Sequence, residues 1–179
     1  MQKPLITLAL VFALGNITPA LSADGTLFFT SKLLDSACIV TPTQHVVLDD
    51  MAVGQLPDIN SVSPRKEFAI ELRNCPPHVQ QAQIRFEGAA SQYTAYRAFA
   101  LDDPDSPTTA KGIAFQIEND PQLNIYAAIA PNTLSSTVTL DSTPGNINKL
   151  IFTGRYVAVE KEVKAGTANV TTQFSIIYP

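Results

Sequence analysis

The composition of this 179-residue chain excludes several classes of protein. Charged residues make up 16% of the sequence, the formal net charge is −4, and no basic cluster occurs, which argues against a nucleic-acid partner. The length suits one domain with at most a short extension.

The first 23 residues have the pattern of a secretory signal. Lys3 supplies a positive start, residues 4–17 form an uncharged apolar run, and Leu21-Ser22-Ala23 ends in the small residue that cleavage requires. A membrane anchor is the alternative, but the run is shorter than the roughly 20 residues that a bilayer needs. We therefore expect export, a mature chain that begins at Asp24, and no membrane span in that mature chain.

Residues 24–35 alternate as a β-strand does. One face carries a mostly apolar set of side chains with one small residue in its middle, because strand side chains point to opposite faces in turn. The set consists of Leu27, Phe29, Ser31 and Leu33. Taken alone, this pattern predicts an ordinary first strand that lies on its own core.

The sequence has two cysteines, Cys38 and Cys75. An even count in an exported chain indicates a disulfide, which by the chain-entropy model stabilises the fold by roughly 4 kcal/mol. Two buried free thiols are the alternative. No C-x-x-C spacing is present, so redox catalysis and a cysteine zinc site are poor interpretations.

Several short stretches with alternating apolar residues follow the first cysteine. The clearest is 82–88, where Ala82, Ile84 and Phe86 share one face. We expect strands within 36–40, 45–48, 67–75, 82–88, 96–101, 112–118, 123–129, 136–140 and 150–159. About nine short strands, with turns between them and no sustained helical period, predict an all-β, antiparallel β-sandwich.

The last twelve residues, 168–179, predict a final strand with an apolar face. Gly166 comes just before this stretch and marks a turn. Pro179 has no N–H to donate, so pairing is expected to end at Tyr178. The side chains that share the apolar face are Val170, Thr172, Phe174, Ile176 and Tyr178.

This ending resembles a known motif. Gly166 lies twelve residues before Tyr178, with Ala168-Asn169 and Phe174 between them. The pattern is similar to the C-terminal motif of subunits of chaperone–usher pili (the type 1 fimbrial family), which Gram-negative bacteria export. The segments around Cys38 and Cys75 also resemble the two cysteine strands of that family.

The resemblance implies an incomplete immunoglobulin-like sandwich that lacks one strand, completed by a donor strand from a partner. Residues 1–23 would be the signal peptide, 24–35 an N-terminal donor-strand extension and 36–179 the pilin domain. Leu27, Phe29, Ser31 and Leu33 would insert into a neighbouring subunit, with Ser31 at a position where the family usually has glycine.

The implied partners are a periplasmic pilus chaperone, an outer-membrane usher and neighbouring pilus subunits. The chaperone would contact the final strand, through the positions Gly166, Val170, Thr172, Phe174, Ile176 and Tyr178. The expected function is that of a structural subunit of a cell-surface fimbrium, exported through the periplasm, that contributes to cell adhesion. The length leaves no room for the second domain of a tip adhesin, whereas shaft, adaptor and terminating roles all stay open.

Catalysis and metal binding have little support in the sequence. His45 and His78 belong to no motif with a mechanism. The carboxylates at 49–50 and at 102–105 lack EF-hand spacing, so solvated acidic turns are the better interpretation. We expect no enzyme activity and no cofactor.

Two competing classes remain. A self-contained secreted β-sandwich that binds a carbohydrate is the main alternative, and it requires residues 24–35 to pair within their own sheet. A secreted hydrolase would need a catalytic triad or dyad that the sequence does not show.

Overall fold

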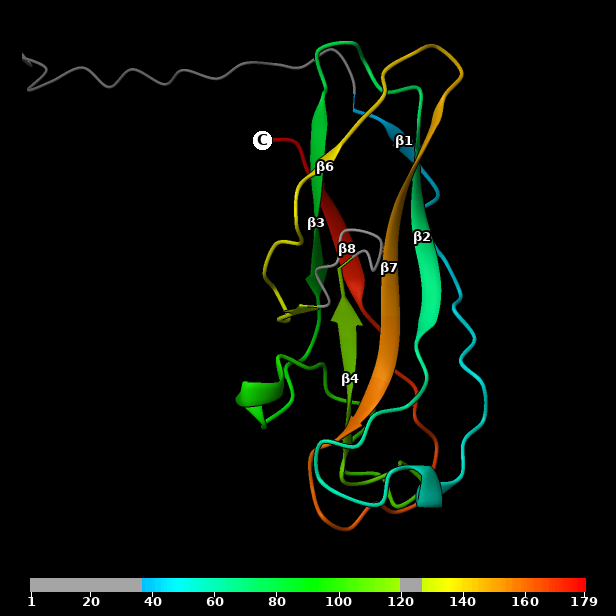
Figure 1. Cartoon of the computed structure of the whole chain (residues 1–179), viewed down its shortest axis with the longest axis vertical. Coiled ribbons are helices and arrows are strands. Elements are labelled where there is room, and N and C mark those ends of the chain that lie inside the picture. Colours follow the sequence, from blue (N-terminus) through cyan, green and yellow to red (C-terminus); the bar gives the residue numbers. More distant parts are fainter. Residues whose placement is uncertain (1–36, 120–126) are drawn as a thin grey trace, which may run out of the picture. The chain divides into compact units, whose positions relative to one another are not determined.

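The computed structural model describes residues 37–119 and 127–179, so the segments 1–23 and 24–35 lie outside the described residues. The described part contains eight strands and two short 3-10 helices (Figure 1). The strands are β1 Ile39–Val40, β2 Lys66–Arg73, β3 Gln81–Glu87, β4 Ile113–Glu118, β5 Ala128–Ile129, β6 Val138–Thr139, β7 Ile147–Ala158 and β8 Gln173–Ile177. The helices, η1 Val53–Gln55 and η2 Thr94–Tyr96, have three residues each, and neither is long or apolar enough to cross a membrane.

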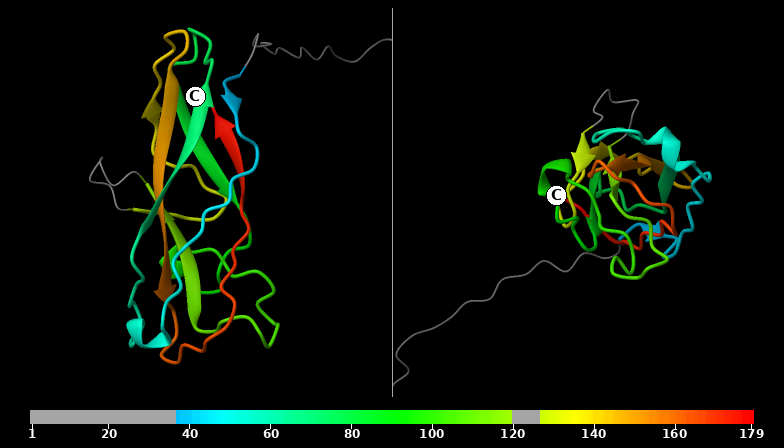
Figure 2. Two further views of the ribbon diagram at one scale, coloured as in Figure 1. Left: turned by 90° about the vertical axis from the view of Figure 1, so that its right-hand side faces the viewer. Right: turned by 90° about the horizontal axis from the view of Figure 1, so that it is seen from below.

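Two antiparallel sheets form the two layers. One has the strand order β1-β2-β7-β4-β5, and the other has the order β6-β3-β8. The long strand β7 lies in the middle of the larger sheet and pairs with β2 on one side and β4 on the other. The views in Figure 2 show the smaller sheet facing the larger one. The predicted all-β antiparallel sandwich is confirmed.

The core lies between the inner faces of the two sheets. Phe68 on β2 is directly opposite Phe152 on β7, and Phe86 on β3 packs edge-on against Phe152 with 5.0 Å between ring centroids. Such edge-to-face pairs stabilise beyond the area that they bury. Around them, the period-two alternation of each strand buries Ile70, Leu72, Ala82, Ile84 and Leu150.

Some predicted strands differ from those in the structure. Residues 45–48 are extended but pair with no strand, and Phe99 in 96–101 makes only isolated bridges, to Ala90 and Phe115. The final strand includes only 173–177 of the predicted 168–179. Of the expected strand at 123–129, residues 123–126 lie outside the described part and β5 occupies 128–129.

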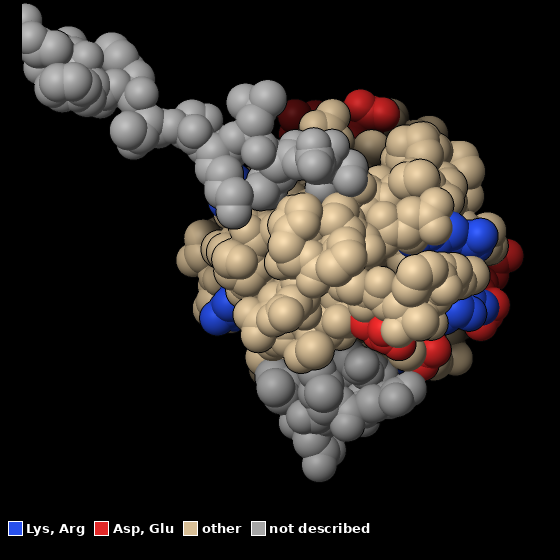
Figure 3. Space-filling view, turned by 90° about the horizontal axis from the view of Figure 1, so that it is seen from above, with Lys and Arg blue, Asp and Glu red and all other residues tan. Residues whose placement is uncertain are grey.

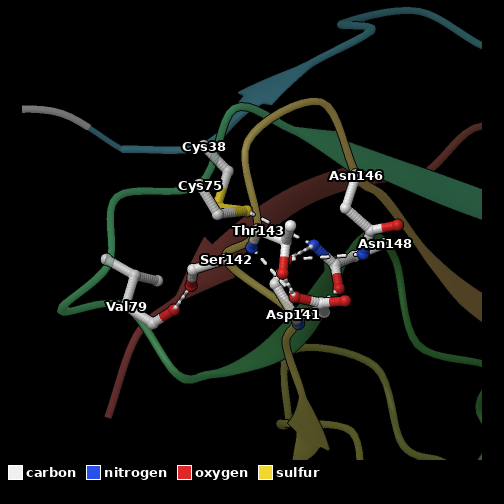
Figure 4. The surroundings of a disulfide bond; sticks show 8 residues. All are labelled: Cys38, Cys75, Val79, Asp141, Ser142, Thr143, Asn146 and Asn148. Atoms are coloured by element: carbon white, nitrogen blue, oxygen red, sulfur yellow. Dashed lines mark hydrogen bonds between the residues drawn. A yellow bond between two sulfur atoms is a disulfide. The ribbon is translucent and has the colours of Figure 1, made fainter.

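Cys38 and Cys75 form a disulfide at one end of the sandwich, as the sequence predicts (Figure 4). Cys38 directly precedes β1, which pairs with β2 through two residues only. The disulfide therefore attaches this short edge strand to the sheet.

The loop beside the disulfide is held by local hydrogen bonds. The Asn148 side chain donates to the Asp141 carbonyl (2.9 Å) and accepts from the Asp141 N–H (2.7 Å). The hydroxyl and N–H of Thr143 both donate to the Asp141 carboxylate and hold the pKa of that group below its usual value. Viewed onto this end, the surface is mostly uncharged in its centre, with charged groups toward the margin (Figure 3).

We expect the disulfide to contribute about 4 kcal/mol, because it closes a loop over a sequence separation of 37 and restricts the unfolded chain. Guanidinium unfolding of the oxidised protein and of a Cys38→Ala/Cys75→Ala variant measures this difference. The variant's own midpoint should not respond to reductant. Equal free energies of unfolding for the two proteins would contradict the expectation.

Candidate functional site

A long groove opens between the two sheets along one side of the molecule. It has a volume of about 1380 Å³ and lies between two extended segments, residues 42–53 and residues 163–174. Figure 2 shows these two segments, one after β1 and one leading into β8, along the same side of the molecule. We call the first segment the N-terminal wall and the second the C-terminal wall.

The floor of the groove is apolar. It consists of inward-facing side chains from four strands, β2, β3, β4 and β7: Phe68, Ile70, Phe86, Ile113, Phe115, Ile117 and Tyr156. Ile70 and Ile117 are 2% exposed, whereas Phe68 and Phe115 are only half-buried. Core side chains are therefore open to solvent along the groove, an arrangement that marks a binding surface in soluble proteins.

The N-terminal wall has few attachments. Among the described residues, no backbone-to-backbone hydrogen bond involves 41–51, and most of these residues are exposed. Lys66 Nζ lies 3.8 Å from Asp49 Oδ1, an exposed ion pair that contributes little. Leu48 and Met51 pack against a smaller apolar cluster that consists of Leu101, Ala110 and Tyr156. Residues 41–51 of this wall therefore have no backbone pairing within the described part of the chain.

Strand β8 presents a free edge to the groove. On β3, the carbonyls of Ile84 and Phe86 accept hydrogen bonds from Ser135 and Asn132, so these two residues face away from β8. Because backbone polar groups alternate in direction along a strand, the neighbouring residues of β3 are the ones that bond β8.

The register then identifies the free groups of β8. Arg85 is opposite Ser175, and Gln83 is opposite Ile177, so Ser175 and Ile177 direct their N–H and C=O groups toward β3. Phe174, which lines the groove, and Ile176 direct theirs away from β3, and no described residue pairs with them on that side. An unpaired strand edge of this kind is a template for another strand.

The residues that precede β8 are bonded to a different segment. The Asp102 N–H donates to the Asn169 carbonyl (2.8 Å), and the Asp102 carboxylate accepts from the N–H (3.0 Å) and hydroxyl (2.8 Å) of Thr171. Ala110 donates to the Thr167 carbonyl (2.9 Å). The segment 102–111 thus fixes the C-terminal wall, which explains why the predicted strand 168–172 joins no sheet.

Two further contacts fix this wall. A β-carbon on Gly166 would lie 2.4 Å from the Ala110 nitrogen and 2.5 Å from the Thr108 carbonyl oxygen, so only glycine allows this close approach. The Tyr156 hydroxyl donates to the Ala168 carbonyl, and burial raises the pKa of Tyr156.

Most of the residues predicted on the apolar face of the final stretch lie against the main core. Four of them pack against the main core while staying half-buried: Val170, Phe174, Ile176 and Tyr178. Thr172 is half-buried and lines the groove with Gly166, Val170 and Phe174. The predicted donor residues Leu27, Phe29, Ser31 and Leu33 lie outside the described residues.

Other predicted candidates are not brought together. His45 lies on the exposed N-terminal wall, and His78 lies in an exposed turn before β3. Within residues 37–119 and 127–179, no group of three or more His, Cys, Asp or Glu side chains could hold a metal. Sequence reasoning did not find the Asp102 contacts, because Asp102 in an acidic turn resembles any solvated carboxylate.

Comparison with known proteins shows the family of this chain. The model of the fimbrial protein family matches residues 27–179. The chain belongs to the fimbrial protein family. It is therefore a structural pilus subunit, its partners include neighbouring subunits, and its place is a cell-surface fimbrium.

Individual relatives agree with this membership. The fimbrial subunit type 1 of Salmonella typhimurium is 28% identical over 165 residues, which cover 90% of this fimbrial chain and 86% of the relative. The probable major fimbrial subunit LpfA of Escherichia coli O157:H7 is 27% identical over 183 residues, which cover 99% and 97% of the two chains.

Solved structures show the same fold. The P pilus rod subunit PapA matches with a TM-score of 0.64 at 16% identity, covering 80% of this fimbrial chain and 100% of PapA. A chaperone–usher pilus structure matches with a TM-score of 0.63 at 17% identity, covering 88% and 96%. The immunoglobulin-like pilin fold is thus confirmed.

Replacing Asp102 by Ala should loosen the C-terminal wall. The change removes both bonds to Thr171, so we expect a loss of about 1 kcal/mol in the free energy of unfolding and faster amide exchange in 167–171. Urea unfolding and hydrogen exchange followed by mass spectrometry measure these effects.

The matched control is Asp105→Ala, in the same turn. No hydrogen bond or ion pair of the Asp105 side chain occurs among the described residues, so its removal should change neither quantity. If both variants exchange at the wild-type rate in 167–171, Asp102 does not hold the wall.

Proposed function

We propose that this fimbrial subunit is an incomplete sandwich whose groove binds a donor strand from a partner. The observation that carries the proposal is the free edge of β8 above an apolar floor. A strand placed in the groove would hydrogen-bond Phe174 and Ile176 and cover the half-buried Phe68 and Phe115. This is strand addition, in which backbone bonds provide affinity and alternate side chains provide specificity.

The proposed donor is the N-terminal extension of the next subunit, residues 24–35. This segment has the same number of residues as the C-terminal wall, 163–174, and an extended strand of that length spans about 40 Å. Its alternate residues Leu27, Phe29, Ser31 and Leu33 would contact the floor. These are mostly apolar, as the floor requires.

A free subunit would carry its groove open. An exposed apolar groove with an unpaired strand edge favours aggregation, so a temporary occupant is needed during export. In this proposal, residues 1–23 direct export to the periplasm, a periplasmic chaperone fills the groove through contacts with β8, and an outer-membrane usher exchanges it for the next subunit. The assembled fimbrium then contributes to cell adhesion.

The proposal explains the unequal walls of the groove. The C-terminal wall is already fixed by Asp102 and Gly166, whereas residues 41–51 of the other wall make no backbone-to-backbone hydrogen bond with any residue that the structure describes. A donor strand would therefore find one ordered edge to pair with and would order the other. Membership in the fimbrial family does not favour the alternative of a carbohydrate-binding module.

The test is export of the chain to the periplasm with and without a coexpressed pilus chaperone, followed by size analysis. We expect the subunit to be recovered as a one-to-one complex with the chaperone and to aggregate without it, because the open groove is otherwise exposed. A variant with residues 24–35 deleted serves as a control for self-assembly through donor strands.

A stable monomer recovered without any chaperone, with cooperative unfolding, would contradict the proposal. The groove would then be closed by the chain itself, and the subunit would be a self-contained sandwich.

A further inference from the structure

Phe115 has an unusual position on the groove floor. It lies on β4 and is half-buried, whereas the next inward residue of the same strand, Ile117, is 2% exposed. Its ring is 5.3 Å from the Tyr156 ring, between centroids. The height of the Phe115 ring therefore limits how deep the groove is at this point.

The ring rests on a residue without a side chain. Gly154 is a buried residue of β7, opposite Ile117 of β4 and diagonal to Phe115. A β-carbon on Gly154 would lie 2.5 Å from Cζ of Phe115, and the three nearest atoms to it all belong to this ring. The tip of the ring thus occupies the space that any other residue at 154 would fill.

The groove offers open space to a displaced ring. The sheet lies beneath the ring and Tyr156 lies beside it, while the groove lies above it. An added methyl group on residue 154 has to move the ring by about 1 Å to reach an ordinary contact distance. The ring would then rise into the groove.

We propose that Gly154 is a specificity-determining residue, which sets the size of the donor side chain that the groove accepts above Phe115. The inference rests on the proposed function, because it concerns the same groove. Without a β-carbon at 154, the floor is lower and accepts a larger donor side chain; with one, the floor favours a smaller side chain.

The experiment uses subunit purified from the periplasm, unfolded and then refolded by dilution with a fluorescein-labelled peptide of residues 24–35. Four further peptides each carry one smaller residue: Leu27→Ala, Phe29→Ala, Ser31→Gly or Leu33→Ala. Fluorescence anisotropy gives the affinity of each peptide for the wild type and for Gly154→Ala.

We expect Gly154→Ala to lower the affinity for the native peptide about tenfold, because the substitution overpacks a filled core site. One of the four smaller peptides should recover most of that loss, and its position identifies the donor residue above Phe115. Each of the other three replacements should change the peptide's affinity for the wild type and for Gly154→Ala by the same factor.

Two variants separate this effect from general destabilisation. Gly54→Ala is the matched control, because a β-carbon at Gly54 has no atom within 4 Å, and it should bind every peptide as the wild type does. In a Phe115→Ala background, Gly154→Ala should have no further effect, because the ring that it displaces is absent.

The outcomes distinguish the two proposals. If the wild type captures no peptide, the proposed function fails and this inference fails with it. Suppose that the wild type captures the native peptide. If Gly154→Ala then binds all five peptides with the wild-type affinity, or binds all five more weakly by one common factor, only the role of Gly154 is overturned. A further loss from Gly154→Ala in the Phe115→Ala background also overturns it.

Discussion

The unpaired edge of β8 is the constraint on which the rest of this structure depends. Its residues alternate between bonds to β3 and free groups that face the groove, and beneath those free groups lie the aromatic side chains of the core. The unpaired backbone groups need hydrogen-bond partners, and the core aromatic side chains need burial. A complete sandwich has both kinds of stabilisation, and an open groove lacks them. One added strand would satisfy both needs at once.

The surrounding residues prepare the groove for such a strand. The C-terminal wall is fixed by the Asp102 side chain, by the Tyr156 hydroxyl, by the close backbone approach at Gly166 and by backbone bonds to the segment 102–111. At the other end of the sandwich, the Cys38–Cys75 disulfide secures the short strand β1, from which the N-terminal wall continues. One wall is fixed, and residues 41–51 of the other have no backbone pairing within the described part of the chain, which is consistent with a site that binds an extended segment.

The sequence predicted the elements whose residues alternate clearly. Ala82, Ile84 and Phe86 predicted β3, and the C-terminal stretch predicted that Phe174, Ile176 and Tyr178 share the core face. It could not show that 168–172 leaves the sheet, because that depends on Asp102, a residue distant in sequence whose contacts no local pattern reveals. The groove floor was equally hidden, since Phe68, Phe115 and Tyr156 line one groove only because β2, β7 and β4 pair in one sheet.

The most direct test of the account is amide hydrogen exchange along β8, residue by residue, with and without a peptide of residues 24–35, on subunit freshly refolded at low concentration. Without the peptide, the amides of Ser175 and Ile177 should be protected and those of Phe174 and Ile176 should exchange quickly. With the peptide, we predict that Phe174 and Ile176 become protected as well. Protection of all four amides in the subunit alone, or no change at Phe174 and Ile176 when the peptide is bound, would contradict the account.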